Sequence, residues 1–185
     1  MALPSTIRRF EIDLSDVEHH VYETLSLRVA QHPSETNAYL LTRVIAYCLY
    51  VSRGVEMSKS GLCNAEEPPL WSHDLTGQME LWIDIGLPAT ERIHKASKRA
   101  QQVIIFTHKG IDRLREKLNS KQIYRASEVV IYPLDPEMLT ELEQSLQRVN
   151  HWSLIHSEGM LFVTSGDLNI SFEMKSHALN ETDLK

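Results

Sequence analysis

The segment Met79–Ile85 constrains the fold more strongly than any other part of the sequence. Its odd-numbered residues are all apolar, whereas the even-numbered ones are Glu80, Trp82 and Asp84, and this is the period of a β-strand. One face of the strand therefore belongs in the core. The other face carries two carboxylates about 13 Å apart, at ~3.3 Å per residue, and we interpret Trp82 between them as a packing residue. Acids on a covered face need cations to compensate them.

Polar residues on either side of this strand point to an acidic site. Asp74 comes just before the strand in a polar turn, and Lys95 lies on the short basic helix that follows it. Mg²⁺ prefers oxygen ligands and keeps several of its waters, so two or three carboxylates are sufficient to hold it. A bound divalent ion activates water and polarises a phosphodiester, and a nearby lysine stabilises the developing charge. Asp74, Asp84 and Lys95 supply this inventory, with Mg²⁺ or Mn²⁺ as the expected cofactor.

The rest of the chain predicts a mixed sheet with helices. A hairpin is expected from Phe10 to Val29, and then a long helix with Ser34 as its N-cap and Glu35 in its first turn. A polar loop is expected at 59–69. Further strands are expected at 55–57, 70–71, 102–107, 129–134, 152–156, 160–164 and 168–174, and further helices after Pro88, over 111–118 and after Asp135–Pro136. This order predicts an α+β fold on a mixed sheet, with residues 1–176 in one domain and 177–185 as a flexible tail.

Composition excludes several classes of protein. The 185 residues are 42% hydrophobic, which is enough for a core, and no apolar run approaches the 18 residues of a membrane span. The N-terminus has no apolar leader segment, so we expect a cytoplasmic protein. Cys48 and Cys63 are expected to be unpaired thiols. There is no Gly-rich phosphate loop and no zinc-binding spacing, and the adjacent His19 and His20 are interpreted as surface residues.

The net charge of −6 conceals a basic segment. Glu91–Arg125 contains ten Lys or Arg against three acids, a balance of +7, whereas the remaining residues contain nine against twenty-two. Such an asymmetry can direct a polyanion to one face of a protein, although solvated helix faces produce charge runs as well. If the segment binds nucleic acid, the expected contact residues are Lys98, Arg99, Arg113 and Arg115.

Several of these motifs together resemble a known family. The line from Asp74 to Pro88, followed by Lys95-Ala96, is similar to the signature of the YaeQ family of small bacterial proteins. His32-Pro33-Ser34-Glu35-Thr36 and Glu67-Pro68 with Leu70-Trp71 also match, so the resemblance covers essentially the whole chain. It implies a variant of the PD-(D/E)XK nuclease fold, similar to restriction endonucleases, here with extra β-hairpins.

The resemblance also implies roles for single residues. Asp74 takes the first-acid position and Asp84 the (D/E) position of the motif. Glu35 resembles an additional metal-side acid of that superfamily. Glu80 shares a face with Asp84 and replaces it if the strand register is shifted by one pair.

Two positions depart from the motif, and the first is His73, where the pattern has proline. The second is the position of the motif's lysine. That lysine should fall at position 86, which is Gly86 in this chain. Lys95 on the following helix is the first candidate to replace it, and Lys98 is the second. Loss of a group that positions the nucleophile can reduce a rate by roughly 10²–10⁴.

Three functions remain open at this point. The first is a Mg²⁺- or Mn²⁺-dependent phosphodiesterase that acts on DNA or RNA. The second is a nuclease-like module without turnover that binds nucleic acid or a protein, with transcription as a candidate process for it. The third is a structural or protein-interaction role in which the acids form only salt bridges.

Overall fold

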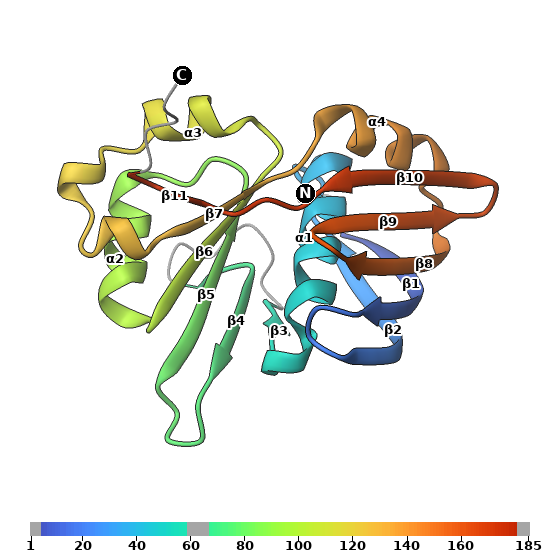
Figure 1. The fold of residues 1–185 in the computed structure, drawn as a ribbon, viewed down its shortest axis with the longest axis horizontal. Coiled ribbons are helices and arrows are strands. Elements are labelled where there is room, and N and C mark those ends of the chain that lie inside the picture. The colour runs from blue at the N-terminus through green and yellow to red at the C-terminus, as the bar shows by residue number, and fades with distance from the viewer. Residues whose placement is uncertain (1–4, 59–66, 181–185) are drawn as a thin grey trace.

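Two mixed β-sheets form the framework of the protein (Figure 1). The computed structural model describes residues 5–58 and 67–180. The first sheet has the strand order β10-β9-β8-β1-β2, and the second has the order β11-β7-β6-β5-β4-β3. The strands of the first sheet are β1 (Thr6–Asp16), β2 (Val21–Gln31), β8 (Val149–Ser157), β9 (Met160–Ser165) and β10 (Leu168–Glu173). Those of the second are β3 (Glu56–Met57), β4 (Leu70–His73), β5 (Met79–Ile85), β6 (Gln102–Thr107), β7 (Val130–Pro133) and β11 (His177–Ala178).

The helices fill the space between the sheets and cover the second sheet. The α-helices are α1 (Asn37–Tyr50), α2 (Thr90–Arg99), α3 (Ile111–Lys117) and α4 (Pro136–Ser145), and short 3₁₀ turns follow at 51–53, 120–122 and 126–128. Helix α1 passes between the two sheets, where it contacts β5, β6 and α4 (Figure 1). Helices α2 and α3 lie on the other side of the second sheet. The expected α+β fold on mixed sheets is confirmed.

Strand β5 contributes to two separate cores. Leu81, Ile83 and Ile85 pack in the core that the second sheet shares with α1 and the first sheet. Trp82 faces the opposite way and packs with residues of α2, β6 and α3. The alternation therefore predicted both faces correctly, and both faces are covered. Because full burial of a Leu or Ile side chain stabilises a fold by roughly 1.5–3 kcal/mol, β5 is strongly fixed in position.

The first sheet joins strands from the N-terminal and the C-terminal parts of the chain. β1 and β2 form the expected antiparallel hairpin, which closes with Asp16 opposite Val21. On its other side β1 pairs in parallel with β8, and this pairing places Asp16 next to His156. A parallel partner 140 residues away leaves no periodic signal in the sequence, so this pairing was not predicted.

The start of α1 differs from the expectation. The helix begins at Asn37, and Thr36 is its N-cap, with the Thr36 hydroxyl accepting from the backbone N–H of Tyr39 at 3.2 Å. Ser34 does not cap the helix, because its hydroxyl lies 2.6 Å from the Nδ1 of His32. Glu35 consequently lies in the link before the helix.

The C-terminal end also differs. His177 and Ala178 pair with β7, and Leu179 is buried in the core beneath α2 and α3. A flexible tail therefore does not begin at residue 177. Residues 181–185, and most of the loop expected at 59–69, lie outside the described residues.

Two expectations from composition concern the thiols and the membrane. Cys48 is buried and free, and burial raises the pKa of its thiol to about 12, whereas Cys63 falls outside the described residues. Among the helices at 5–58 and 67–180, none is both long and apolar enough to span a bilayer.

Candidate functional site

Asp84 lies near the end of β5 in a buried polar environment. The indole N–H of Trp82 donates to its Oδ2 at 2.7 Å, because residues two apart on a strand face the same way. The Nε of Arg92, in the first turn of α2, lies 2.9 Å from both carboxylate oxygens. The side chain of Asp84 is only 4% exposed. The Asp84 site therefore consists of three side chains: the acid itself, the indole of Trp82 on the same strand, and the guanidinium of Arg92 on the next helix.

Burial and compensation act in opposite directions on this acid. Burial raises the pKa of Asp84, whereas the charge of Arg92 and the hydrogen bonds from Trp82 and Arg92 lower it, and burial is the larger effect. The geometry is nevertheless that of a charged pair, since Arg92 donates to the carboxylate at hydrogen-bond distance. The negative charge of the Asp84 carboxylate is thus compensated by Arg92 within the protein.

Arg92 was not identified from the sequence. Its guanidinium also donates to the carbonyl oxygen of Glu67 at 2.9 Å and lies 5.3 Å from the centre of the Trp82 ring. Arg99 lies over the same ring at 5.9 Å. Positions 92 and 99 share one helix face at a spacing of seven, and this spacing was the signal available in the sequence.

Asp74 does not meet Asp84. It lies in the exposed turn at the tip of the β4–β5 hairpin (Figure 1), where its Oδ1 accepts from the Thr76 N–H, the Thr76 hydroxyl and the Gln78 N–H at 2.7–2.9 Å. The Thr76 hydroxyl is the main reason that the pKa of Asp74 is lowered. From Gln78 the strand runs six residues to Asp84, so the two acids are separated by roughly 20 Å at ~3.3 Å per residue.

The strand register shows which residue does face Asp84. Leu70 of β4 pairs with Ile83 of β5 at the end of the antiparallel ladder, and Ile105 of β6 pairs with Asp84 on the other side. Neither β4 nor β6 contains an acid. The expected convergence of Asp74 and Asp84 on one metal ion is therefore not found, because the turn that carries Asp74 lies at the opposite end of β5 from Asp84.

Glu80 forms an ion pair of its own. Its carboxylate contacts the guanidinium of Arg53, which also donates to Gln102 at 2.7 Å. The register of β5 against β6 pairs Asp84 with Ile105 and continues without a shift. Glu80 thus does not take the place of Asp84.

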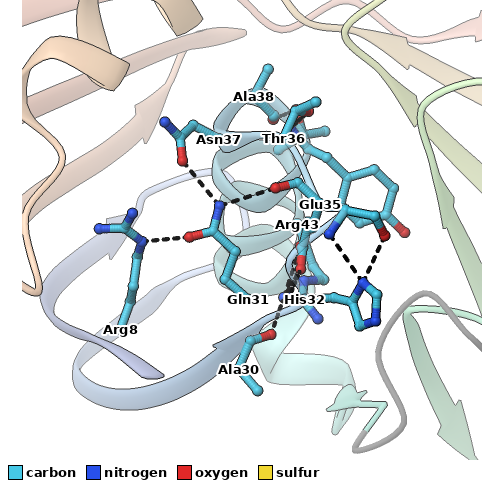
Figure 2. Close-up of polar contacts among 12 residues, drawn as sticks. Arg8, Ala30, Gln31, His32, Glu35, Thr36, Asn37, Ala38 and Arg43 are labelled. Carbon is cyan, nitrogen blue, oxygen red and sulfur yellow. Dashed lines mark hydrogen bonds and ion pairs between the residues drawn. The ribbon is translucent and has the colours of Figure 1, made fainter. Parts of the chain in front are cut away.

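Glu35 is held by Arg43 at the start of α1 (Figure 2). The Nη2 of Arg43 lies 2.9 Å from Oε1 and donates to Oε2 at 3.2 Å, and both side chains are at most 3% exposed. The backbone N–H of His32 also donates to Oε2 at 3.1 Å. Burial raises the pKa of Glu35, and Arg43 is the first group that opposes this effect.

Glu35 is therefore a buried acid whose carboxylate is engaged by Arg43. Gln31 connects this ion pair to the hairpin, donating to the Glu35 carbonyl and to Asn37 while accepting from Arg8 (Figure 2). The arrangement joins β1, β2 and α1, which is what a structural ion pair does.

His108 is buried and Tyr39 is partly buried, and both rings lie close to Gly86. Burial raises the pKa of Tyr39, and the charge of Asp84 is the next cause. Burial also lowers the pKa of His108 to about 4, and its Nδ1 is without a hydrogen-bond partner in the described part of the chain. The His108 ring packs edge-on to Tyr39, with centroids 6.3 Å apart. Both aromatic groups are thus neutral at pH 7.

The backbone conformation and the close neighbours of Gly86, just after β5, disfavour the lysine that the motif has at this position. Its φ of +83° is a conformation that side chains other than glycine rarely adopt, and an added Cβ would lie 3.3 Å from the His108 ring and 3.9 Å from Tyr39. Its N–H donates to the carbonyl oxygen of Phe106 at 2.7 Å. A side chain at position 86 would strain the backbone and crowd His108.

The predicted nucleic-acid contacts lie on the outer layer formed by α2 and α3. Lys98, Arg99 and Arg113 are exposed, whereas Lys95 and Arg115 are half-buried. Arg115 also donates to the carbonyl oxygen of Ala178 at 3.3 Å. The structure therefore brings the basic residues to one side of the second sheet, but it does not bring the four predicted metal-ligating acids together.

The fold and site define a class of α+β proteins with two mixed sheets and a buried, arginine-paired aspartate on the strand that both cores share. A solved structure of YaeQ protein from Pseudomonas syringae has this fold, with a TM-score of 0.85, 28% identity, and coverage of 98% of this chain and 99% of that one. YaeQ protein from Xanthomonas axonopodis pv. citri gives a TM-score of 0.82 at 28% identity, with 94% and 97% coverage.

Comparisons of sequence agree. The family described as YaeQ protein matches residues 1–174. The uncharacterized protein YaeQ of Escherichia coli (strain K12) is 26% identical over 175 residues, which is 94% of this chain and 96% of that protein. The chain belongs to the YaeQ family.

Proposed function

We propose that the chain binds nucleic acid through the layer formed by α2 and α3, on a nuclease-like scaffold that does not cleave. The observation that carries this proposal is the set of exposed cations on that layer. They are Lys98 and Arg99 of α2 and Arg113 and Lys117 of α3, with Lys109 and Lys121 in the segments just before and after α3. A surface that neutralises several phosphates gains affinity through release of counterions, without reading sequence.

The helices and turns of this layer are connected to one another. The Thr90 hydroxyl of α2 donates to the carbonyl oxygen of Lys117 in α3 at 3.4 Å, and the Tyr124 N–H donates to the His94 ring at 3.3 Å. Tyr124 itself is 51% exposed. An exposed aromatic ring among cations offers a stacking surface for an unpaired base. These features favour a single-stranded region or a flexible end as the ligand.

The cleavage hypothesis has less support. Asp84 and Glu35 are each paired with an arginine, Asp74 is distant, and neither β4 nor β6, the strands beside β5, contains an acid. The residues present do not fit a Mg²⁺ site at Asp84, because Mg²⁺ needs at least one or two accessible carboxylates in octahedral geometry. Binding without turnover is the function that these contacts support.

Charge reversal tests the proposed surface. The double variant Lys98→Glu/Arg113→Glu should bind labelled single-stranded DNA and RNA at least roughly tenfold more weakly than the native chain, since two phosphate contacts become repulsive. Fluorescence anisotropy at fixed salt gives the affinities. The matched control is Arg28→Glu/Arg148→Glu, which makes the same change in net charge at exposed positions on and beside the first sheet. Equal weakening in both variants, or no binding by the native chain, would refute the proposal.

A further inference from the structure

A second polar cluster lies where the two ends of the chain meet in the first sheet. Asp16 is the last residue of β1, and its side chain is 2% exposed. The Nδ1 of His19 lies 2.7 Å from its Oδ2, and the Nδ1 of His156 lies 3.0 Å from its Oδ1. His156 reaches this position because β8 runs parallel to β1 and pairs the two residues directly (Figure 1).

The carboxylate of Asp16 lacks a permanent cation. Within the described ranges its charged partners are only the two histidine rings, and its other hydrogen bond comes from the His19 N–H at 3.3 Å. By contrast, the buried acids Glu35 and Asp84 each have an arginine. A buried carboxylate is costly unless it is paired or coordinates a metal. The histidines compensate it fully only when a proton or a metal ion supplies positive charge.

The geometry of the cluster is close to that of a coordination sphere. One ligand atom from each of the three side chains lies within 4.8 Å of the others. Atoms that bind one ion at about 2.0–2.2 Å are roughly 3.3–3.6 Å apart in a tetrahedron, so small side-chain rotations are sufficient. The rings of His19 and His156 are already stacked, with centroids 6.1 Å apart and planes at 25°.

A cavity opens beside the two histidines. It has a volume of about 260 Å³, and its lining includes Tyr50 from α1 and Tyr132 from β7, so it lies at the junction of the two sheets. The two tyrosine hydroxyls are 3.4 Å apart. Glu18 is on the rim, where it accepts from the Gly159 N–H at 2.7 Å and ties the β1–β2 turn to the β8–β9 turn.

We propose that Asp16, His19 and His156 bind a divalent transition metal ion such as Zn²⁺, with its remaining coordination positions directed to this cavity. Two imidazoles and one carboxylate suit transition metals, whereas Mg²⁺ prefers a set of oxygens. The ion takes the place of the Nδ1 proton of each ring, the ring proton then resides on Nε2, and any additional proton is released to solvent. The site is independent of the proposed nucleic-acid surface.

The sequence could not reveal this cluster. His19 was interpreted as a surface residue, and its side chain is indeed 58% exposed, but this exposure does not reveal its contact with Asp16. In the structure residues 17–20 form a turn, and His19 bends back onto Asp16 while the third member arrives from β8.

Calorimetric titration with Zn²⁺, after dialysis against a chelator, tests the site. We expect saturable binding of one ion by the native chain, and binding weakened at least ~tenfold in His156→Gln and in His19→Gln. The matched controls are His151→Gln, on the same strand, and His20→Gln, in the same turn, because both are exposed and outside the cluster. The controls should bind as the native chain does.

A second measurement guards against misfolded variants. Zn²⁺ should raise the Tm of the native chain and of both controls, but not that of His156→Gln, because only a ligand that binds the folded state stabilises it. Co²⁺ absorption in the visible region should report nitrogen and oxygen ligation in the native chain. Absence of saturable Zn²⁺ binding, or equal loss of binding in the controls and the cluster variants, would overturn the proposal and leave a hydrogen-bonded acid–histidine network.

Discussion

At the scale of single residues, the chemistry of the candidate site depends on how Asp84 is neutralised. Arg92 approaches it from α2, and Trp82 donates to it from the same strand face near the buried end of β5. A metal ion would have to displace Arg92 from the carboxylate. The same holds for Glu35, which Arg43 holds across the start of α1.

Removal of Arg92 should therefore expose the cost of the buried charge. We expect Arg92→Met to lower the free energy of unfolding by about 2–4 kcal/mol, somewhat below the 3–5 kcal/mol typical of fully buried pairs, because the Arg92 side chain is 22% exposed. The double variant Asp84→Asn/Arg92→Met should recover part of this loss, since no unpaired carboxylate remains. Urea unfolding of the native chain, both single variants and the double variant measures the coupling. Additive losses would contradict this description of the pair.

At the scale of elements, the end of β5 determines which residues can surround Asp84. The strand passes into α2 through Gly86, whose backbone has a positive φ and whose α-carbon faces His108. Position 86 cannot carry the motif lysine without strain, and the neighbouring strands β4 and β6 contain no acid. These two features account for the absence of a lysine and of a second acid beside Asp84.

Two glycines allow backbone strain to be separated from crowding. Gly86 and Gly77 both have a φ of +83°, but an added Cβ at Gly77 meets nothing within 4 Å, whereas at Gly86 it lies 3.3 Å from His108. Gly77→Ala should cost about 1–2 kcal/mol of stability from the backbone alone, and Gly86→Ala should cost more. The difference between the two unfolding free energies measures the contact with His108. Equal losses would show that the His108 ring moves aside freely.

At the scale of the whole molecule, charge is divided between the two layers of the fold. The segment of balance +7 comprises most of α2, strand β6, helix α3 and the turn after it, and the rest of the chain, first sheet included, holds the acidic excess. Such a separation orients a polyanion toward α2 and α3 although the net charge is −6. The Asp16 cluster lies beside a cavity at the junction of the two sheets, and it is therefore separate from the layer formed by α2 and α3.

Periodicity predicted the elements better than their contacts. The faces of β5, the β1–β2 hairpin and the Asp135 cap of α4 follow from local rules, and the structure confirms them. Partners distant in the sequence did not follow, because pairing of β1 with β8 and of Arg43 with Glu35 depends on how the sheets assemble. Asp74 was misplaced for the same reason: sequence spacing does not show which strand residue faces Asp84.

The most direct measurement is the affinity of the chain for labelled single-stranded DNA and RNA over a series of salt concentrations. It is made once in a chelator and once in excess Mg²⁺. After each incubation the oligonucleotide is recovered and its length is checked for cleavage. We predict binding in the chelator, with the logarithm of the binding constant falling against the logarithm of salt concentration at a slope of roughly −0.7 per phosphate contacted. The same salt dependence is expected in Mg²⁺, apart from competition of Mg²⁺ for the phosphates. No cleavage is expected under either condition. Binding that requires Mg²⁺, or Mg²⁺-dependent cleavage that Asp84→Asn abolishes, would contradict a binding module without turnover and restore the phosphodiesterase hypothesis.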